Sequence, residues 1–231
     1  GLKEKRIGFY TKSFGINHEV DSLVMRSVRV IEEMGATVIK IDRISPPETA
    51  QNSFQVMLYE YKEGLNKYFS SLGEDAPVKN LEELIKLNEQ DSFELKYFNQ
   101  AYLKMAQEKS GLGSEEYLNA LSGLKKMSQK LGIDRIMNEY NLDAIIAATG
   151  SPAWTTDLIN GDNYHISSSS PAAWAGYPNI SVPMGNIHGL PVGLSFFGRA
   201  WSEPTLIEIC YGFEQATKSR IIPTYRTNDD S

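Results

Sequence analysis

Residues 144–200 read AIIAATGSPAWTTDLINGDNYHISSSSPAAWAGYPNISVPMGNIHGLPVGLSFFGRA. Only three of their side chains are charged, Asp157, Asp162 and Arg199, although the chain average of 23% charged residues would give about thirteen. We therefore expect this uncharged block to be mostly buried. It also holds five of the ten prolines and seven of the eighteen glycines, which excludes one long helix. The block predicts short buried strands joined by turns.

Three apolar runs within or beside the block are the predicted strands: Asp143–Ala147, Asn179–Val182 and Val192–Phe197. The segment Asn186–Gly189 between the last two is typical of a turn, so we expect them to form an antiparallel pair. The four serines 167–170 precede Pro171, which is favoured at the first position of a helix. Serine hydroxyls at this place are expected to cap free backbone amides.

The beginning of the chain predicts a second part of the same sheet. Two β-rich runs, Arg6–Tyr10 and Thr37–Ile41, flank a segment from Glu19 to Met34 with apolar residues at helical spacing. Strand, helix and strand of this size form a crossover unit, which implies two parallel strands. An amphipathic helix, Glu203–Lys218, is expected to follow the last strand. The predicted fold class is α/β, with a mixed β-sheet flanked by helices.

The middle of the chain has a different pattern. From Pro46 to about residue 140 the sequence is charged and mostly helical, with breaks near residues 73–77 and 111–113. We interpret residues 46–140 as a helical insert or cover layer within a single domain of residues 1–231.

Composition excludes several classes of function. The formal net charge is −6 and no run of Lys or Arg occurs, so nucleic acid is not expected as a partner. No apolar run approaches the length of a membrane span, and no membrane partner is expected. The single cysteine, Cys210, excludes an internal disulfide, and three scattered histidines, expected in loops or turns, do not predict a metal site. The connection at residues 11–18 has one glycine and lacks a dinucleotide fingerprint, so no cofactor is expected.

The serine run invites a nucleophile interpretation, because His165 and Asp162 lie nearby in the sequence. No G-x-S-x-G pattern occurs, and no lysine that could act as a base lies between Lys130 and Lys218. We therefore predict no catalytic residue in this chain. A serine-rich helix start can still hold a polar ligand.

Several segments carry a family resemblance. Residues Ser168–Gly185, His188–Trp201 and Tyr211–Thr217 are similar, in order and spacing, to the C-terminal part of amidase signature family enzymes. Asp143–Trp154 resembles the family's strand and following Pro/Thr loop, and Leu2–Gly8 resembles the point where the family's second half begins.

The resemblance implies hydrolysis of linear amide C–N bonds by a serine nucleophile, a second serine in a cis peptide and a lysine base. In the family those groups, and the oxyanion loop, precede the segment that resembles Gly1 onward. The expectation is thus a C-terminal amidase domain without the N-terminal catalytic half, inactive alone and cytoplasmic. Residues Trp154–Asp162 with the serine run resemble the peptide-amidase-like branch. The tRNA-linked branch tends to have an acidic residue where this chain has Ile166 and Ser167.

Two loops leaving the uncharged block are the predicted substrate contacts, because ligands bind beyond the carboxyl ends of strands in open α/β sheets. The predicted substrate-binding residues are Thr149, Ser151, Trp154, Thr155, Asp157, Ser167, Ser168 and Ser169. The expected partners are a small amide or peptide-amide substrate and the missing N-terminal half of the enzyme. A homo-oligomer is left open. Two structural alternatives stay open: Trp154 packs against Trp174, or Asp157 caps a turn. A non-catalytic binding module that reuses the fold, or a small-ligand receptor, is the alternative function.

Overall fold

The structure is a computed structural model in which residues 1–223 are described. The chain divides into two compact units. The first contains Gly1–Pro46 and the chain from Ser128 onward, and the second contains Pro47–Met127. The prediction that the middle segment is an insert or cover layer of one domain stays a prediction.

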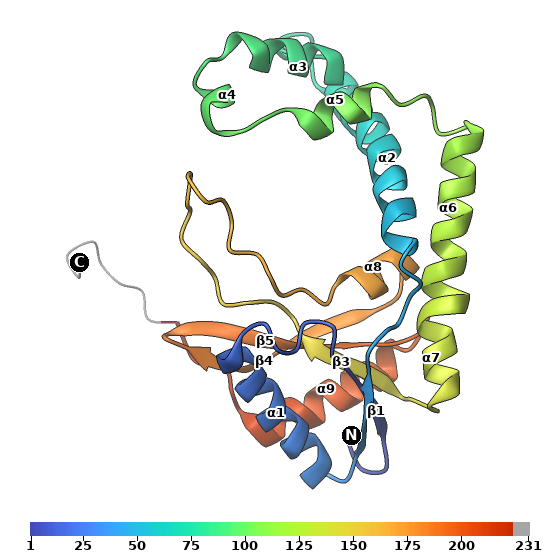
Figure 1. The fold of residues 1–231 in the computed structure, drawn as a ribbon, viewed down its shortest axis with the longest axis vertical. Coiled ribbons are helices and arrows are strands. Elements are labelled where there is room, and N and C mark those ends of the chain that lie inside the picture. Colours follow the sequence, from blue (N-terminus) through green and yellow to red (C-terminus); the bar gives the residue numbers. More distant parts are fainter. Residues whose placement is uncertain (224–231) are drawn as a thin grey trace, which may run out of the picture. The chain divides into compact units, whose positions relative to one another are not determined.

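A five-stranded mixed sheet organises the first unit (Figure 1). Its strands are β1 (Arg6–Tyr10), β2 (Thr37–Ile41), β3 (Ala144–Ala148), β4 (Asn179–Ile187) and β5 (Leu190–Phe197), in the spatial order β2-β1-β3-β5-β4. β1 pairs in parallel with both β2 and β3, whereas β5 is antiparallel to β3 and β4. The predicted α/β class, the parallel crossover pair and the antiparallel pair are confirmed.

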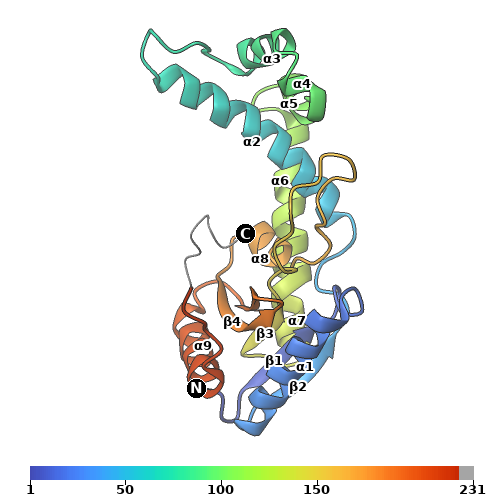
Figure 2. The same cartoon turned by 90° about the vertical axis from the view of Figure 1, so that its left-hand side faces the viewer.

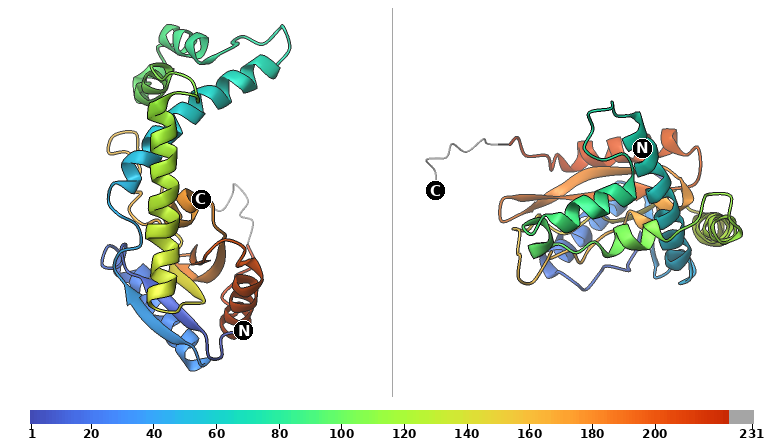
Figure 3. Two further views of the ribbon diagram at one scale, coloured as in Figure 1. Left: turned by 90° about the vertical axis from the view of Figure 1, so that its right-hand side faces the viewer. Right: turned by 90° about the horizontal axis from the view of Figure 1, so that it is seen from above.

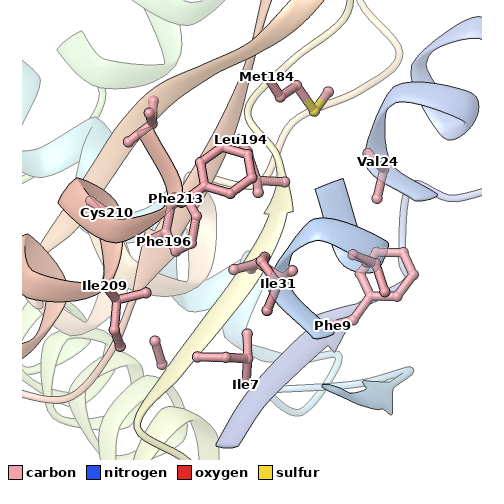
Figure 4. Packing of buried hydrophobic residues seen from close by; sticks show 14 of the residues in the cluster. Ile7, Phe9, Val24, Ile31, Met184, Leu194, Phe196, Ile209, Cys210 and Phe213 are labelled. Carbon is pink, nitrogen blue, oxygen red and sulfur yellow. The ribbon is translucent and has the colours of Figure 1, made fainter. Parts of the chain in front are cut away.

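Helices α1 (His18–Glu33) and α9 (Glu203–Thr217) lie on the same side of this sheet. Asn17 caps α1, because its side-chain oxygen accepts hydrogen bonds from the amides of Glu19 and Val20. The core on this face contains side chains from both helices and four strands, including those labelled in Figure 4. The rings of Phe196 and Phe213 lie 5.4 Å apart there, and Cys210 is buried as predicted.

The opposite face of the sheet has its own core. It is covered by a π-helical turn at Gln129–Ile133, by α7 (Asp134–Glu139) and by α8 (Ser170–Ala175). Ile145 and Phe197 point into this core from neighbouring strands and are fully buried. Figure 2 shows α7 and α8 with β3 and β4 from a second direction. Each face of the sheet is therefore packed, which explains the scarcity of charge in its strands.

The second unit is helical. Its helices are α2 (Thr49–Ser71), α3 (Leu81–Gln90), α4 (Glu94–Tyr97), α5 (Ala101–Gln107) and α6 (Glu115–Ser128). The predicted breaks fall between α2 and α3 and between α5 and α6. α2, α3 and α5 pack on a small core of Leu58, Leu81, Ile85 and Ala106, and Figure 3 shows these helices from two directions. Within residues 1–223, no helix is long and apolar enough to cross a membrane.

Three expectations from the sequence are wrong. The uncharged block is not mostly buried, because residues 153–156 and 158–165 are exposed in a connection without regular structure and many other residues of the block are half-buried. This connection has few charges because it is rich in hydroxyl-bearing and turn residues, and such residues provide little apolar surface that could be buried. Ser169 is the N-cap residue of α8 but makes no side-chain capping hydrogen bond to the described backbone. His18 begins α1 and does not lie in a loop.

Candidate functional site

The topology creates a crevice between the carboxyl ends of β1 and β3. The chain leaves β1 through α1 to reach β2 on one side, while β3 pairs with the other side of β1. Such a switch point leaves room for a ligand beyond the strand ends. A pocket lies here, lined by Phe9 and Tyr10 from β1 and by Ala147 and Ala148 from β3. Its cavity volume is about 10 Å³, which is room for about one water molecule, and the pocket opens to solvent.

The remaining walls come from α1 and the loop before it. Ser13 and Phe14 line the pocket from the loop, and Asp21 and Val24 from α1. Phe14 packs edge-on against Phe9, with ring centroids 5.6 Å apart. The Asp21 carboxylate accepts a hydrogen bond of 2.9 Å from the Gly15 amide and so ties the loop to the helix. Among the described residues that line the pocket, Asp21 is the charged one.

Ser168 completes the pocket with a buried hydroxyl. The residue is 3% exposed, and its Oγ has no hydrogen-bond partner among the described residues. A buried hydroxyl without a partner costs about 1–3 kcal/mol, so this atom favours a polar ligand atom or a water in the pocket. The neighbouring Ser167 also lines the pocket, and its backbone forms a β-bridge with Gly150 just after β3. Within residues 1–223, none of serines 167–170 forms a hydrogen bond with His165 or a lysine.

The predicted contacts nearest to β3 are Thr149 and Ser151. Thr149 Oγ1 lies 2.8 Å from Ser181 Oγ and 2.9 Å from Ser195 Oγ. Ser151 Oγ is buried and has no partner among the described residues. Both residues are half-buried at the start of the connection that leads to α8.

Trp154 lies further along the same connection. Its side chain is 37% exposed, and its indole N–H donates a 3.1 Å hydrogen bond to Asp162 Oδ1. The ring packs edge-on against Tyr164, with centroids 5.9 Å apart. The aromatic neighbour of Trp154 is thus Tyr164, and the open alternative of a contact with Trp174 is not what the structure shows.

Asp157 caps a turn, which is the structural alternative that the sequence left open for this residue. Its Oδ1 accepts hydrogen bonds of 2.9 Å from the amides of both Ile159 and Asn160, and its Oδ2 accepts one from the Asn160 side chain. These hydrogen bonds, with those from Asn160 largest, hold the pKa of the carboxyl below its usual value. Thr155 beside it is exposed, and the Ser169 hydroxyl lies 3.3 Å from that of Ser167.

The structure thus brings only Ser167 and Ser168, of the eight predicted residues, to the pocket wall. Trp154, Thr155 and Asp157 belong to the exposed part of the connection. Sequence reasoning missed Phe9, Tyr10 and Asp21, because each fits an ordinary strand or helix start. The available signal was topological, since Phe9 and Tyr10 end a strand that pairs in parallel on both sides. In the described residues, no group of three or more His, Cys, Asp or Glu side chains could hold a metal ion.

A mixed sheet with helices on both faces and a pocket at its switch point defines an α/β domain. Residues 1–207 match the sequence model of the family described as Amidase. The chain therefore belongs to the Amidase family, and the resemblance found in the sequence is confirmed.

Individual relatives agree with this assignment. The chain is 35% identical to a probable amidase of Arabidopsis thaliana, over 97% of this chain and 40% of the relative. It is 26% identical to a glutamyl-tRNA(Gln) amidotransferase subunit of Staphylococcus haemolyticus, over 87% of this chain and 42% of that protein. The chain thus spans less than half the length of these relatives.

Solved structures extend the similarity to the fold. A peptide amidase bound to the competitive inhibitor chymostatin superposes with a TM-score of 0.88 at 36% identity, covering 97% of this chain and 46% of that one. The native peptide amidase of Stenotrophomonas maltophilia gives 0.86 at 36% identity, covering 98% and 45%. The predicted similarity to peptide-amidase-like proteins and the amidase signature fold are therefore confirmed.

Proposed function

We propose that this chain forms part of the substrate-pocket wall of an enzyme that hydrolyses linear amide C–N bonds. The observation that carries the proposal is the match to a peptide amidase over 97% of this chain, at 36% identity and a TM-score of 0.88. A small amide or a peptide amide is the proposed substrate class. The pocket between β1 and β3, with its unpartnered Ser168 hydroxyl, supplies polar atoms suited to an amide group.

Catalysis is proposed to need residues that this chain does not contain. A serine becomes nucleophilic only beside a base, and serines 167–170 make no hydrogen bond to such a group in the described structure. The relatives are more than twice as long as the matched segment, which leaves room for a nucleophile, a base and oxyanion donors elsewhere. The proposed partner is that further part of the enzyme. A cytoplasmic location and a homo-oligomer stay predictions.

The alternative function, a non-catalytic binding module, has less support. The relatives and solved structures described above are named as a probable amidase, a peptide amidase and part of an amidotransferase. The polar atoms of the pocket suit an amide group in either case, so the pocket does not favour the alternative.

Two variants test whether the exposed connection, whose residues Trp154 and Asp157 do not line the pocket between β1 and β3, also contacts the substrate in the longer enzyme proposed here. Trp154→Ala and Asp157→Ala should each lower kcat/KM for a peptide amide roughly tenfold, which is ~1.4 kcal/mol of transition-state binding. Their melting temperatures should stay nearly unchanged, because both side chains are exposed or pair only within their loop. Asn163→Ala, in the same exposed loop, is the matched control and should alter neither quantity.

The isolated 231-residue chain should not turn over the same amide. Hydrolysis by the purified chain that disappears when one of its own serines is replaced would refute the assignment of catalysis to other residues. A lower melting temperature with unchanged kinetics in the two loop variants would instead make Trp154 and Asp157 scaffold residues.

A further inference from the structure

An Asn-Gly pair lies in the connection between β3 and α8, which Figure 1 shows as a long loop that leaves the sheet. Asn160 is the only asparagine of the chain that a glycine follows, and both residues are exposed to water. Glycine has no Cβ, so its backbone nitrogen can approach the preceding asparagine side chain without hindrance. A Cβ atom built at Gly161 would meet nothing within 4 Å, so no neighbouring group obstructs this approach.

Asp157 holds both groups that would react in this pair. Its Oδ2 accepts a 2.8 Å hydrogen bond from the side-chain amide of Asn160, and its backbone carbonyl accepts one of 3.0 Å from the Gly161 amide. Its Oδ1 accepts a further hydrogen bond of 2.9 Å from the Asn160 backbone amide. The nitrogen that would attack, Gly161 N, and the nitrogen that would leave, Asn160 Nδ2, are thus hydrogen-bonded to the same residue.

We propose that Asn160 is a site of spontaneous deamidation and that the turn formed by Asp157 controls its rate. The Gly161 nitrogen attacks Cγ of Asn160, a C–N bond forms between these atoms, and the Cγ–Nδ2 bond breaks. The Nδ2 group leaves as ammonia with the proton that the Gly161 nitrogen gives up, and a cyclic imide remains. Water then adds to either imide carbonyl, which gives aspartate or isoaspartate at position 160. Water is the only other reactant.

The turn slows this reaction. The attack requires the Gly161 nitrogen to lose its proton and the Asn160 side chain to rotate toward it, and both changes break hydrogen bonds to Asp157. The hydrogen bonds from Asn160, and then the one from Ile159, hold the pKa of the Asp157 carboxyl below its usual value, so the group is ionised at neutral pH. Hydrogen bonds to an ionised carboxylate are stronger than those between neutral groups.

Deamidation reverses the sign of one contact in the turn. The new carboxylate at position 160 replaces the amide that donates to Asp157 Oδ2, so two negative groups face each other there. We expect the turn to open, because the charges repel and the acceptor has lost its donor. Asn160→Asp copies the aspartate product. In this variant the Ile159 amide, whose acceptor is Asp157 Oδ1, should exchange its hydrogen with solvent faster than in the unaltered protein.

Mass spectrometry of the longer enzyme, aged at mildly alkaline pH in water enriched in heavy oxygen, tests the site. Fragment ions assign each new acid group, with its heavy oxygen, to one residue. Acid should form at Asn160 faster than at Asn163, which is exposed in the same loop but is followed by the bulky Tyr164. Acid formation at Asn163 at an equal or higher rate would overturn the proposal.

Three variants test the role of the turn. Asp157→Ala should speed acid formation at Asn160 about tenfold, because it removes the carboxylate acceptor. Asp157→Asn keeps one acceptor oxygen and should have a smaller effect. Asp162→Ala is the matched control, since this loop carboxylate accepts from the Trp154 indole N–H, and the rate at Asn160 should stay nearly unchanged. Equal acceleration in Asp162→Ala, or none in Asp157→Ala, would overturn the role of Asp157.

A free peptide of residues 153–165 tests the same role without any variant. The peptide lacks the fold that holds the turn, so it should form acid at Asn160 about tenfold faster than the folded enzyme does. An equal rate in the peptide and in the enzyme would overturn the control by the turn. The outcome is independent of the proposed function, because acid formation at Asn160 is measured without any amide substrate.

Discussion

The two units of this chain are stabilised in different ways. The first unit buries large apolar side chains on both faces of a sheet, and Ile7, Ile145, Phe196 and Phe197 are fully buried. The second unit buries fewer apolar side chains: one cluster has four buried residues, and the unit's other buried apolar residues are Val56, Tyr59, Val78, Tyr117, Ala120 and Leu124. The comparison shows that a lack of charge marks the strands β3, β4 and β5, in which burial determines the fold, and not the first unit as a whole.

Polar contacts between helices supplement the small core of the second unit. The Tyr59 hydroxyl donates a 2.7 Å hydrogen bond to Glu116, and Tyr117 donates one of 2.8 Å to Glu60. The Lys62 ammonium donates to the backbone carbonyls of Gln107 and Lys109, at 2.8 and 2.7 Å. These contacts join segments that are distant in sequence, and they need charged residues, which are scarce in the sheet strands.

Replacing a core residue by alanine should show the difference in stability between the two units most clearly. Phe196→Ala should cost about 3–5 kcal/mol of unfolding free energy, because the side chain is fully buried and packs on Phe213. Leu81→Ala should cost about 2–3 kcal/mol, near the low end for such changes, since the smaller core can collapse around the gap. Urea unfolding followed by circular dichroism measures both. An equal or larger loss for Leu81→Ala would refute the difference in core packing.

Helix caps offer a smaller, matched comparison. Asn17 caps α1 in the first unit and Asn80 caps α3 in the second, each through its side-chain oxygen. Asn17→Ala and Asn80→Ala should each cost about 1 kcal/mol, because the first leaves two backbone amides and the second leaves one without their side-chain acceptor. The Asn→Asp variants keep the acceptor and serve as controls that should retain stability. If the Asp variants lost as much unfolding free energy as the Ala variants, the N-cap hydrogen bonds would not be the cause of the loss.

The strands of the first unit could be predicted because their signals are local. Arg6–Tyr10 and Thr37–Ile41 are strands with the predicted bounds, and the predicted runs lie within or beside the other three. The pocket could not be predicted in the same way, because Phe9, Asp21 and Ser168 meet only after the chain has folded. The Thr149 hydroxyl likewise forms hydrogen bonds with Ser181 and Ser195, which lie 32 and 46 positions away in the sequence.

The exposed part of the uncharged block shows where amino-acid composition fails to predict burial. A lack of charge predicted burial, and this is correct for the strands, where alternate side chains face a core. It is wrong for residues 158–165, whose backbone has no neighbouring strand among the described residues and whose polar groups pair within the loop. Low charge therefore predicts burial only where a regular element presents its side chains to a core.

The smallest expected effect concerns pH and lies in the first unit. Burial, and then the hydrogen bond that its hydroxyl donates to Asp134, raise the pKa of Tyr177 to about 12. A pKa raised by folding means that the folded state holds the proton more tightly. Its contribution is fully present below the unfolded pKa of Tyr, about 10, and is lost as the pH rises toward 12.

Tyr177→Phe should therefore flatten the decline of stability between pH 10 and pH 12. The difference should be only a few tenths of a kcal/mol, because Tyr177 is only half-buried and water screens the interaction with Asp134. Urea unfolding of both proteins at several pH values in this range measures it. Tyr140→Phe is the control, since the pKa of Tyr140 is raised mainly by the adjacent Glu139 and a smaller change is expected there. Identical pH profiles for the Tyr177→Phe variant and the unaltered protein would show that this contact adds nothing to the stability of the first unit.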